Sequence, residues 1–183
     1  MKKFIIIIIL VLSIFQLVVM AANIDIGNAA ERRTTYYPST STVIIKTNPA
    51  NATGKITSIE VYCYKNLVNF EVATFNNISG TNFTTIDYEY IGSVVAGAKR
   101  TFTVDIDVNE GNYLGYHFTG GSIDVDEEGG DGYWYFSSTD KIPCTNETFS
   151  IGSGITRLFS LYGTGATAEV GAEENAIFFG MAF

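Results

Sequence analysis

The sequence predicts an all-β protein: a single antiparallel β-sandwich, jelly-roll-like, that follows an N-terminal signal peptide. After residue 22 no 3.6-residue hydrophobic period appears, and clusters of Gly, Asn and Ser separate short runs of β-branched and aromatic residues. In the run 100–108 apolar and polar residues alternate, as expected for a half-buried strand. Its apolar side chains are Phe102, Val104, Ile106 and Val108. Many short antiparallel strands of this kind suit two packed sheets.

The first 22 residues are typical of a secretory signal peptide. Lys2 and Lys3 give a positive start, an apolar run begins at Phe4, and Ala21 and Ala22 are small residues at the exit. Export to a secreted or cell-surface location follows from this interpretation. The alternative is an uncleaved anchor, because residues 4–22 are just long enough to span a bilayer, and only then would the membrane be a partner.

The predicted strands after the leader follow one another with short turns between them. They cover residues 42–47, 55–64, 68–75, 82–91, 100–108, 112–119, 122–126, 132–136, 157–162 and 176–183. Turn-forming residues such as Asn48-Pro49 and Gly129-Gly130 fall in the breaks. Within 55–64 the odd-numbered residues from Thr57 to Cys63 are expected to face the core. The predicted organisation is a signal peptide (1–22), a β-sandwich domain (23–168) and an apolar C-terminal strand of the same domain (169–183).

The C-terminal strand carries no charge over residues 176–183. Alternation places Ile177, Phe179, Met181 and Phe183 on one face, and Phe178 lies on the other. Exposing so many large apolar side chains to water is unfavourable. The strand is therefore expected to close the sheet of its own chain or that of a neighbour, and the second arrangement would give a homo-oligomer.

Composition excludes several classes of protein. The 183 residues contain 46% hydrophobic and 14% aromatic residues, which is ample for a core and excludes intrinsic disorder. Eleven basic residues against 19 acidic ones leave no cationic surface for phosphates, so no nucleic-acid partner is expected. Two Cys and one His cannot supply the usual zinc ligand sets.

The two cysteines, Cys63 and Cys144, both lie in the part of the chain that is expected to be exported. In an oxidising compartment an even pair predicts a disulfide. The alternative, two separate buried thiols that behave as small hydrophobic groups, stays open.

An acidic hairpin at residues 124–132 is the first candidate site. Asp, Asp, Glu and Gly stand at the first, third, fifth and sixth places of a calcium-loop pattern, but Tyr135 stands where the bidentate Glu belongs. The candidate calcium ligands are Asp124, Asp126, Glu128 and Asp131. In the alternative interpretation the segment is a hairpin turn whose aspartates face water, and no cofactor is required.

Tyrosines beside this hairpin form the second candidate site. Alternation in 132–136 places Trp134 toward the core and Tyr133 and Tyr135 outside. With Asp131 nearby, these rings are a candidate platform for a sugar face or for a protein surface. The one histidine, His117, is expected to be a satisfied strand residue, and no nucleophile motif accompanies it, so the chain is not expected to be an enzyme. Asn-x-Ser/Thr sequons occur at Asn51, Asn77, Asn82 and Asn146.

Three segments of the chain resemble parts of uncharacterised β-sandwich modules of phage and metagenomic surface proteins. These segments are Asn48–Thr57, Tyr88–Val94 and Ser160–Gly165. The likeness covers roughly residues 24–165 and implies a non-catalytic, surface-exposed module, without transferring any functional residue. The expected function is an exported surface binding or adhesion module, with a glycan or a surface protein as partner. The alternative is a structural subunit of a surface filament, layer or virion-like assembly.

Overall fold

The computed structural model describes residues 21–152 and 156–167. Of these residues, 62% lie in β-strands and none in a helix, so the predicted all-β class is confirmed. The described part of the chain accordingly holds no helix that could cross a bilayer. Apart from Ala21 and Ala22, the expected leader lies outside the described residues, and so does the expected C-terminal strand at 169–183.

Every strand pair in the described residues is antiparallel, and the strands join into one large sheet. The strands are β1 (Asn23–Gly27), β2 (Thr35–Tyr37), β3 (Thr42–Ile45), β4 (Gly54–Ser79), β5 (Asn82–Val94), β6 (Lys99–Val108), β7 (Tyr113–His117), β8 (Gly120–Asp126), β9 (Tyr133–Phe136), β10 (Glu147–Thr148), β11 (Ser150–Ile151), β12 (Leu158–Phe159) and β13 (Leu161–Ala166). The main path through the sheet runs β1-β13-β4-β7-β3-β9-β11. Strands β1, β2, β10 and β11 were not predicted, because each is short or lies in a segment rich in turn-forming residues.

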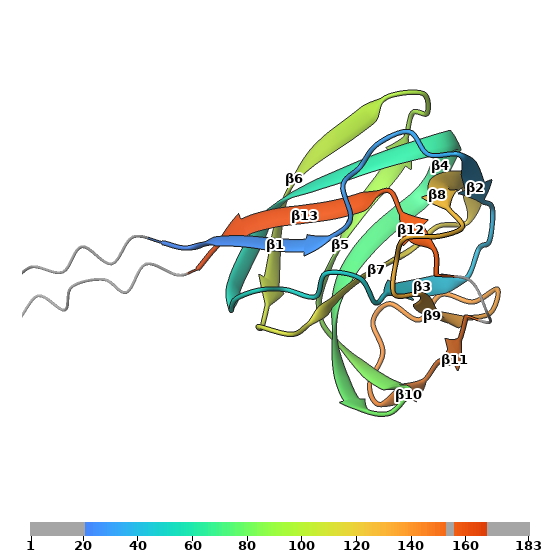
Figure 1. Cartoon of the computed structure of the whole chain (residues 1–183). Helices are drawn as coiled ribbons and strands as arrows, with labels where there is room; N and C mark the ends of the chain where they lie inside the picture. The colour runs from blue at the N-terminus through green and yellow to red at the C-terminus, as the bar shows by residue number, and fades with distance from the viewer. Residues whose placement is uncertain (1–20, 153–155, 168–183) are drawn as a thin grey trace, which may run out of the picture. The chain divides into compact units, whose positions relative to one another are not determined.

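Strand β4 is a single strand of 26 residues, where the sequence predicted two strands separated at residues 65–67. Its first part pairs with β6 and β13, its middle with β8, and its second part with β7 and β5. Figure 1 shows β4 running up to the end of the sheet that holds β2 and β8 and then turning down toward β10. At this bend the register shifts between Cys63 and Val68, and Asn69 has a positive φ of 51°. Gly121 of β8 packs so closely on Asn66 that a side chain there would overlap the backbone.

A β-bulge near the start of β4 changes which residues face the core. Against β13, Ile56 and Ser58 pair with the consecutive residues Gly165 and Thr164, so Thr57 is an extra, unpaired residue of β4. Ile56 is therefore buried and Thr57 exposed, contrary to the sequence prediction, while Ile59, Val61 and Cys63 are buried as expected.

The larger hydrophobic cluster joins both parts of β4. It contains Ile59 and Val61 from the first part and Phe70 and Val72 from the second, so the inner faces of the two parts share one core. A smaller cluster lies on the opposite face of the second part. It comprises Ile44, Ala73, Phe75, Phe83, Ile142 and Phe149. Strands β3 and β9 are thus covered on both faces.

Edge strand β6 pairs only with β4 among the described strands, yet side chains of β5 engage its outer backbone groups. The Asp107 N–H donates to the carboxylate of Asp87 at 2.8 Å, and the Asp105 N–H donates to that of Glu89 at 3.0 Å. Acidic side chains therefore satisfy backbone donors that would otherwise face solvent.

Replacing Phe83 by Ala should lower the free energy of unfolding by about 3–5 kcal/mol, because the ring is fully buried against Trp134 and Phe149 and its loss leaves a cavity. Ile78→Ala on the same β4–β5 hairpin is the matched control. Ile78 is 51% exposed, so its change should stay within about 0.5 kcal/mol. Urea unfolding measures both variants, and equal effects would show that the smaller cluster does not stabilise the fold.

Candidate functional site

Three adjoining hollows form a groove along the outer face of β4. Their volumes are about 470, 220 and 180 Å³, and Arg32 lines all three. We call this surface the tyrosine groove. Its defining residues are Arg32, Tyr36, Tyr62, Tyr64, Asp124 and Tyr162. A further hollow of about 550 Å³ borders Asn23 and Ala166, next to segments outside the described residues.

Strand alternation places the tyrosines of β4 in the groove. Val61 and Cys63 face the core, so Tyr62 and Tyr64 face outward, where they line the hollows. Tyr36 comes from β2, which pairs with the other edge of β8. Strand β8 thus lies between the two strands that supply Tyr36 and Tyr64.

The rings of Tyr36 and Tyr64 stack in parallel. Their centroids are 4.6 Å apart and their planes differ by 5°, although the residues remain 42% and 56% exposed. The Lys65 ammonium lies 6.0 Å from the Tyr36 ring centre. Stacked aromatic rings that remain open to solvent offer a rigid, flat apolar surface with hydroxyl groups at its rim.

Asp124 is a buried acceptor that lines two of the hollows. It is paired with Tyr36 in the β2–β8 register and is only 2% exposed. One carboxylate oxygen, Oδ1, accepts a hydrogen bond from the Arg33 backbone N–H at 3.2 Å, while Oδ2 is buried with no partner among the described residues. Burial raises the pKa of Asp124, and the hydrogen bond from Arg33 and the charge of Arg32 oppose that rise. A buried oxygen without a donor is unusual and indicates a ligand group or water at this point.

The structure does not bring the four predicted calcium ligands together. Asp126 instead pairs with Arg33 at 2.9 Å and accepts hydrogen bonds from Thr34, which lower its pKa although desolvation opposes them. Glu128 and Asp131 are exposed on the turn, and Asp124 is buried. The hairpin forms a turn whose acidic side chains pair with Arg33 and Arg157, and Asp124, which the alternative interpretation placed in water, is buried.

The predicted position of Tyr133 was wrong. Tyr133 is 6% exposed and belongs to the larger cluster, and its hydroxyl accepts a hydrogen bond from Arg157 at 2.9 Å. Tyr135 is half-buried against the same cluster, and Trp134 packs against the smaller one. Both faces of β9 are covered, so alternation no longer separates inside from outside. Asp131 remains exposed, but neither ring beside it forms an open platform.

The sequence could have indicated part of the tyrosine groove. Tyr62 and Tyr64 flank Cys63 in a run whose core positions from Ile59 to Cys63 were predicted correctly, and the same alternation turns both tyrosines outward. Tyr36 was placed in a loop, and no sequence pattern connects it to Tyr64 or to Asp124.

The two cysteines are free thiols that lie in different environments. Cys63 is fully buried in the larger cluster, whereas Cys144 packs against the smaller one and hydrogen-bonds to Thr85 through its backbone N–H at 2.9 Å. Thr85 pairs with Phe75, twelve residues beyond Cys63 on β4, or about 40 Å along the strand. The structure therefore has two separate thiols, which was the alternative interpretation, and no disulfide between Cys63 and Cys144. Burial raises the pKa of Cys63 to about 11.

The four sequons lie at turns and strand ends. Asn51 and Asn146 are exposed, and Asn77 and Asn82 are half-buried. The Asn82 side-chain amide donates to Asn146 Oδ1 at 3.3 Å, so these two acceptor sites are direct neighbours.

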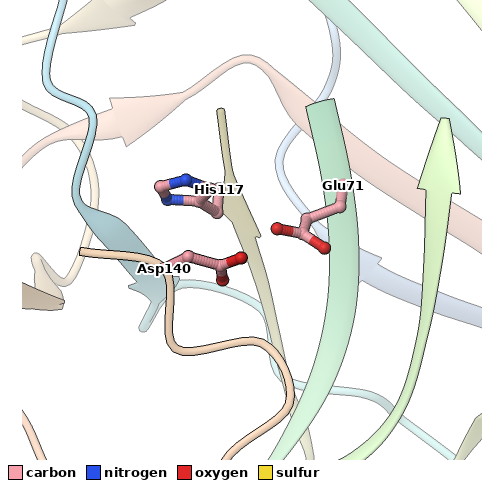
Figure 2. A group of neighbouring side chains, drawn as sticks. All are labelled: Glu71, His117 and Asp140. Atoms are coloured by element: carbon pink, nitrogen blue, oxygen red, sulfur yellow. The ribbon is translucent and has the colours of Figure 1, made fainter. Parts of the chain in front are cut away.

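A second cluster of functional side chains lies away from the groove. Glu71 of β4, His117 of β7 and Asp140 of the loop after β9 are neighbours, and the carboxylates of Glu71 and Asp140 face one another (Figure 2). One ligand atom from each lies within 4.8 Å of the others. Burial, together with the charge and hydrogen bonding of Asp140, raises the pKa of Glu71 to about 7. Burial also lowers the pKa of His117, opposed by Asp140 and the Ser41 backbone. The sequence showed no sign of this cluster.

Comparison with known proteins gives no relative for this chain. No family model matches it, and neither a curated protein nor a solved structure does.

The thiols provide a direct test of this arrangement. At pH 8 the native chain should leave Cys63 unmodified by a thiol reagent, because roughly 0.1% of a thiol with pKa 11 is ionised and the group is buried. In denaturant, both Cys63 and Cys144 should react. Protein exported by its host and treated without reductant is the sample, and mass spectrometry is the readout. A non-reduced mass lower by two hydrogens would contradict the assignment.

Replacing Glu71 by Gln should raise the free energy of unfolding more at pH 8 than at pH 5. The folded chain keeps the Glu71 proton up to about pH 7, whereas the unfolded chain releases it near pH 4.5. The stability of the native chain therefore falls as the pH rises between these values, and Gln removes that loss, on the order of 1–3 kcal/mol. Urea unfolding of the native chain and the variant, in buffer free of divalent cations, measures this difference in the free energy of unfolding at each pH. An equal effect at both pH values would contradict the raised pKa.

Proposed function

We propose that this chain is an exported, non-enzymatic surface binding module whose ligand is a glycan. The tyrosine groove is the observation that carries the proposal. Sugar rings present C–H faces that pack on flat aromatic rings, while their hydroxyls require charged or polar partners at the rim. The stacked Tyr36–Tyr64 pair provides the flat aromatic surface, and Arg32 and Asp124 provide the charged partners for the hydroxyls.

The dimensions of the groove favour a linear glycan over a folded protein. Each hollow is small, and the smaller two, at about 220 and 180 Å³, fall below the size of a pocket for a drug-sized ligand. Three adjoining hollows that are all lined by Arg32 suit an oligosaccharide, whose sugar rings are rigid units repeated along a chain. The unpartnered Asp124 Oδ2 would accept a hydrogen bond from a ligand hydroxyl.

The proposal includes an architecture and a location. We infer that the bent sheet forms the two layers of a jelly-roll-like β-sandwich, since residues from both parts of β4 share one core. The apolar leader at 1–22 is inferred to direct the domain to the exterior or the cell surface. The resemblance to surface modules of phage and metagenomic origin agrees with this location.

A glycan array with the purified protein tests the proposal, followed by calorimetry with a ligand that binds. Tyr64→Ala should weaken binding about 10-fold or more, because a large apolar side chain contributes roughly 1.5–3 kcal/mol when buried and each 1.4 kcal/mol is tenfold. Asp124→Asn should also weaken binding.

Tyr90→Ala is the matched control. Tyr90 is 60% exposed on β5 and lines none of the three hollows, so its replacement should leave the affinity unchanged. An array without any bound glycan, or a Tyr64→Ala variant with native affinity, would overturn the proposal.

A structural subunit of a surface filament, layer or virion-like assembly is the second candidate. The observation that favours it is a row of exposed side chains on β5, Ile86, Tyr88 and Tyr90, which a neighbouring copy could cover. Gel filtration over a range of concentrations distinguishes the two, since a persistent monomer would contradict assembly.

A further inference from the structure

The cluster of Glu71, His117 and Asp140 is built by strand register. Glu71 of β4 and His117 of β7 are directly paired in the antiparallel ladder, which brings their side chains to about 5 Å at Cβ. Their neighbours Phe70, Val72 and Tyr116 point into the larger cluster, so Glu71 and His117 share the opposite face. In Figure 2, the Asp140 carboxylate approaches that of Glu71 from the loop after β9.

The loop that carries Asp140 is anchored on both sides. Thr42 of β3 donates to the Thr139 carbonyl and accepts from the Lys141 N–H, at 3.0 and 2.9 Å. Asp140 Oδ1 accepts from the Ile142 N–H at 2.8 Å, which leaves its other oxygen for a ligand. The three side chains are therefore held close together by backbone that is itself fixed.

Two groups of the cluster are buried and incompletely satisfied by the described residues around them. Glu71 is 8% exposed, and no Lys or Arg forms an ion pair with it among the described residues. His117 is 5% exposed, and its Nδ1 is buried with no hydrogen-bond partner in the described part of the chain. The expectation that His117 is a satisfied strand histidine was thus wrong. A buried acid without a cationic partner and a buried imidazole nitrogen without a hydrogen-bond partner, both judged over the described residues, indicate a ligand that supplies positive charge.

We infer that Glu71, His117 and Asp140 bind one divalent first-row transition cation, for which zinc is the representative probe. The donor set decides the class of ion. Imidazole nitrogen with carboxylate oxygen suits zinc or manganese, whereas calcium and magnesium prefer oxygen alone. The sequence excluded the usual Cys and His zinc sets, and this set of one His and two acids lies outside them.

The present geometry requires a modest closure around the ion. With bonds of about 2.0–2.1 Å, two ligand atoms on a tetrahedral zinc lie about 3.3 Å apart. The ligand atoms of Glu71, His117 and Asp140 lie within 4.8 Å of one another, so they must move closer to bind the ion. Asp140 is exposed, so ions can enter from solvent on its side and water can fill the remaining coordination positions. This site is separate from the tyrosine groove and does not depend on the proposed glycan.

The single histidine makes the test specific. The purified chain, without a histidine tag and freed of metal by a chelator, is titrated with zinc by calorimetry and by NMR of the imidazole resonances. We expect one saturable ion per chain, a shift of the one set of imidazole signals, and a rise in melting temperature by mass action. Calcium at the same concentrations should leave the imidazole signals in place.

Asp140→Asn is the informative variant, because Asp140 is exposed and Asn keeps the acceptor for the Ile142 N–H. It should weaken zinc binding by more than the roughly 10–100-fold typical of changes around the ligands of a metal site. Glu110→Gln removes another exposed carboxylate and should leave the affinity unchanged, which controls for attraction to an acidic protein. Glu71→Gln, which is expected to be at least as stable as the native chain without metal, should abolish zinc binding.

Three results would overturn the inference. The first is no saturable binding of zinc, the second is native affinity in Asp140→Asn, and the third is binding without a shift of the His117 signals. The last result would place the ion elsewhere on the acidic surface.

Discussion

The continuous hydrogen bonding of β4 is the constraint on which the rest of the structure depends. This one strand pairs with five others, β5, β6, β7, β8 and β13. Its bulges and the positive φ of Asn69 let it turn without losing its partners, so that its two parts face a common core. A strand so extensively paired fixes the register of its neighbours, because a slip of one residue would move every side chain to the wrong face.

The same strand positions both candidate sites. Tyr62 and Tyr64 lie just before the bend and face outward into the groove, and Glu71 lies just after it, directly paired with His117. The two sites therefore occur on different parts of one strand and can be altered independently. The groove depends on side chains that stay exposed, whereas the Glu71 cluster depends on burial by the loop that carries Asp140.

The alternation of apolar and polar residues along a single strand predicted which of its side chains are buried. The buried face of β6 and the core positions Ile59 to Cys63 followed from residue patterns alone. The continuity of β4 did not, because Asn66 and Asn69 look like turn residues, whereas here they are exposed residues of a bulged strand. The position of Tyr133 was mistaken for a different reason. Tyr37, Phe159 and Arg157 cover the face of β9 that the pattern assigned to solvent, and long-range coverage of this kind leaves no periodic signal. The groove and the Glu71 cluster were missed because each joins residues far apart in the chain.

The carboxylates of Asp87 and Glu89 have a consequence for how this molecule meets other copies of itself. An edge strand with free backbone donors is a template on which a second chain can extend the sheet, the first step toward a fibril. On β6 two of those donors are already occupied by acidic side chains, which would also repel the carbonyl oxygens of an arriving strand. Sheet growth is therefore blocked along this border, and copies of the protein concentrated at a surface could associate only through their side-chain faces or through another edge.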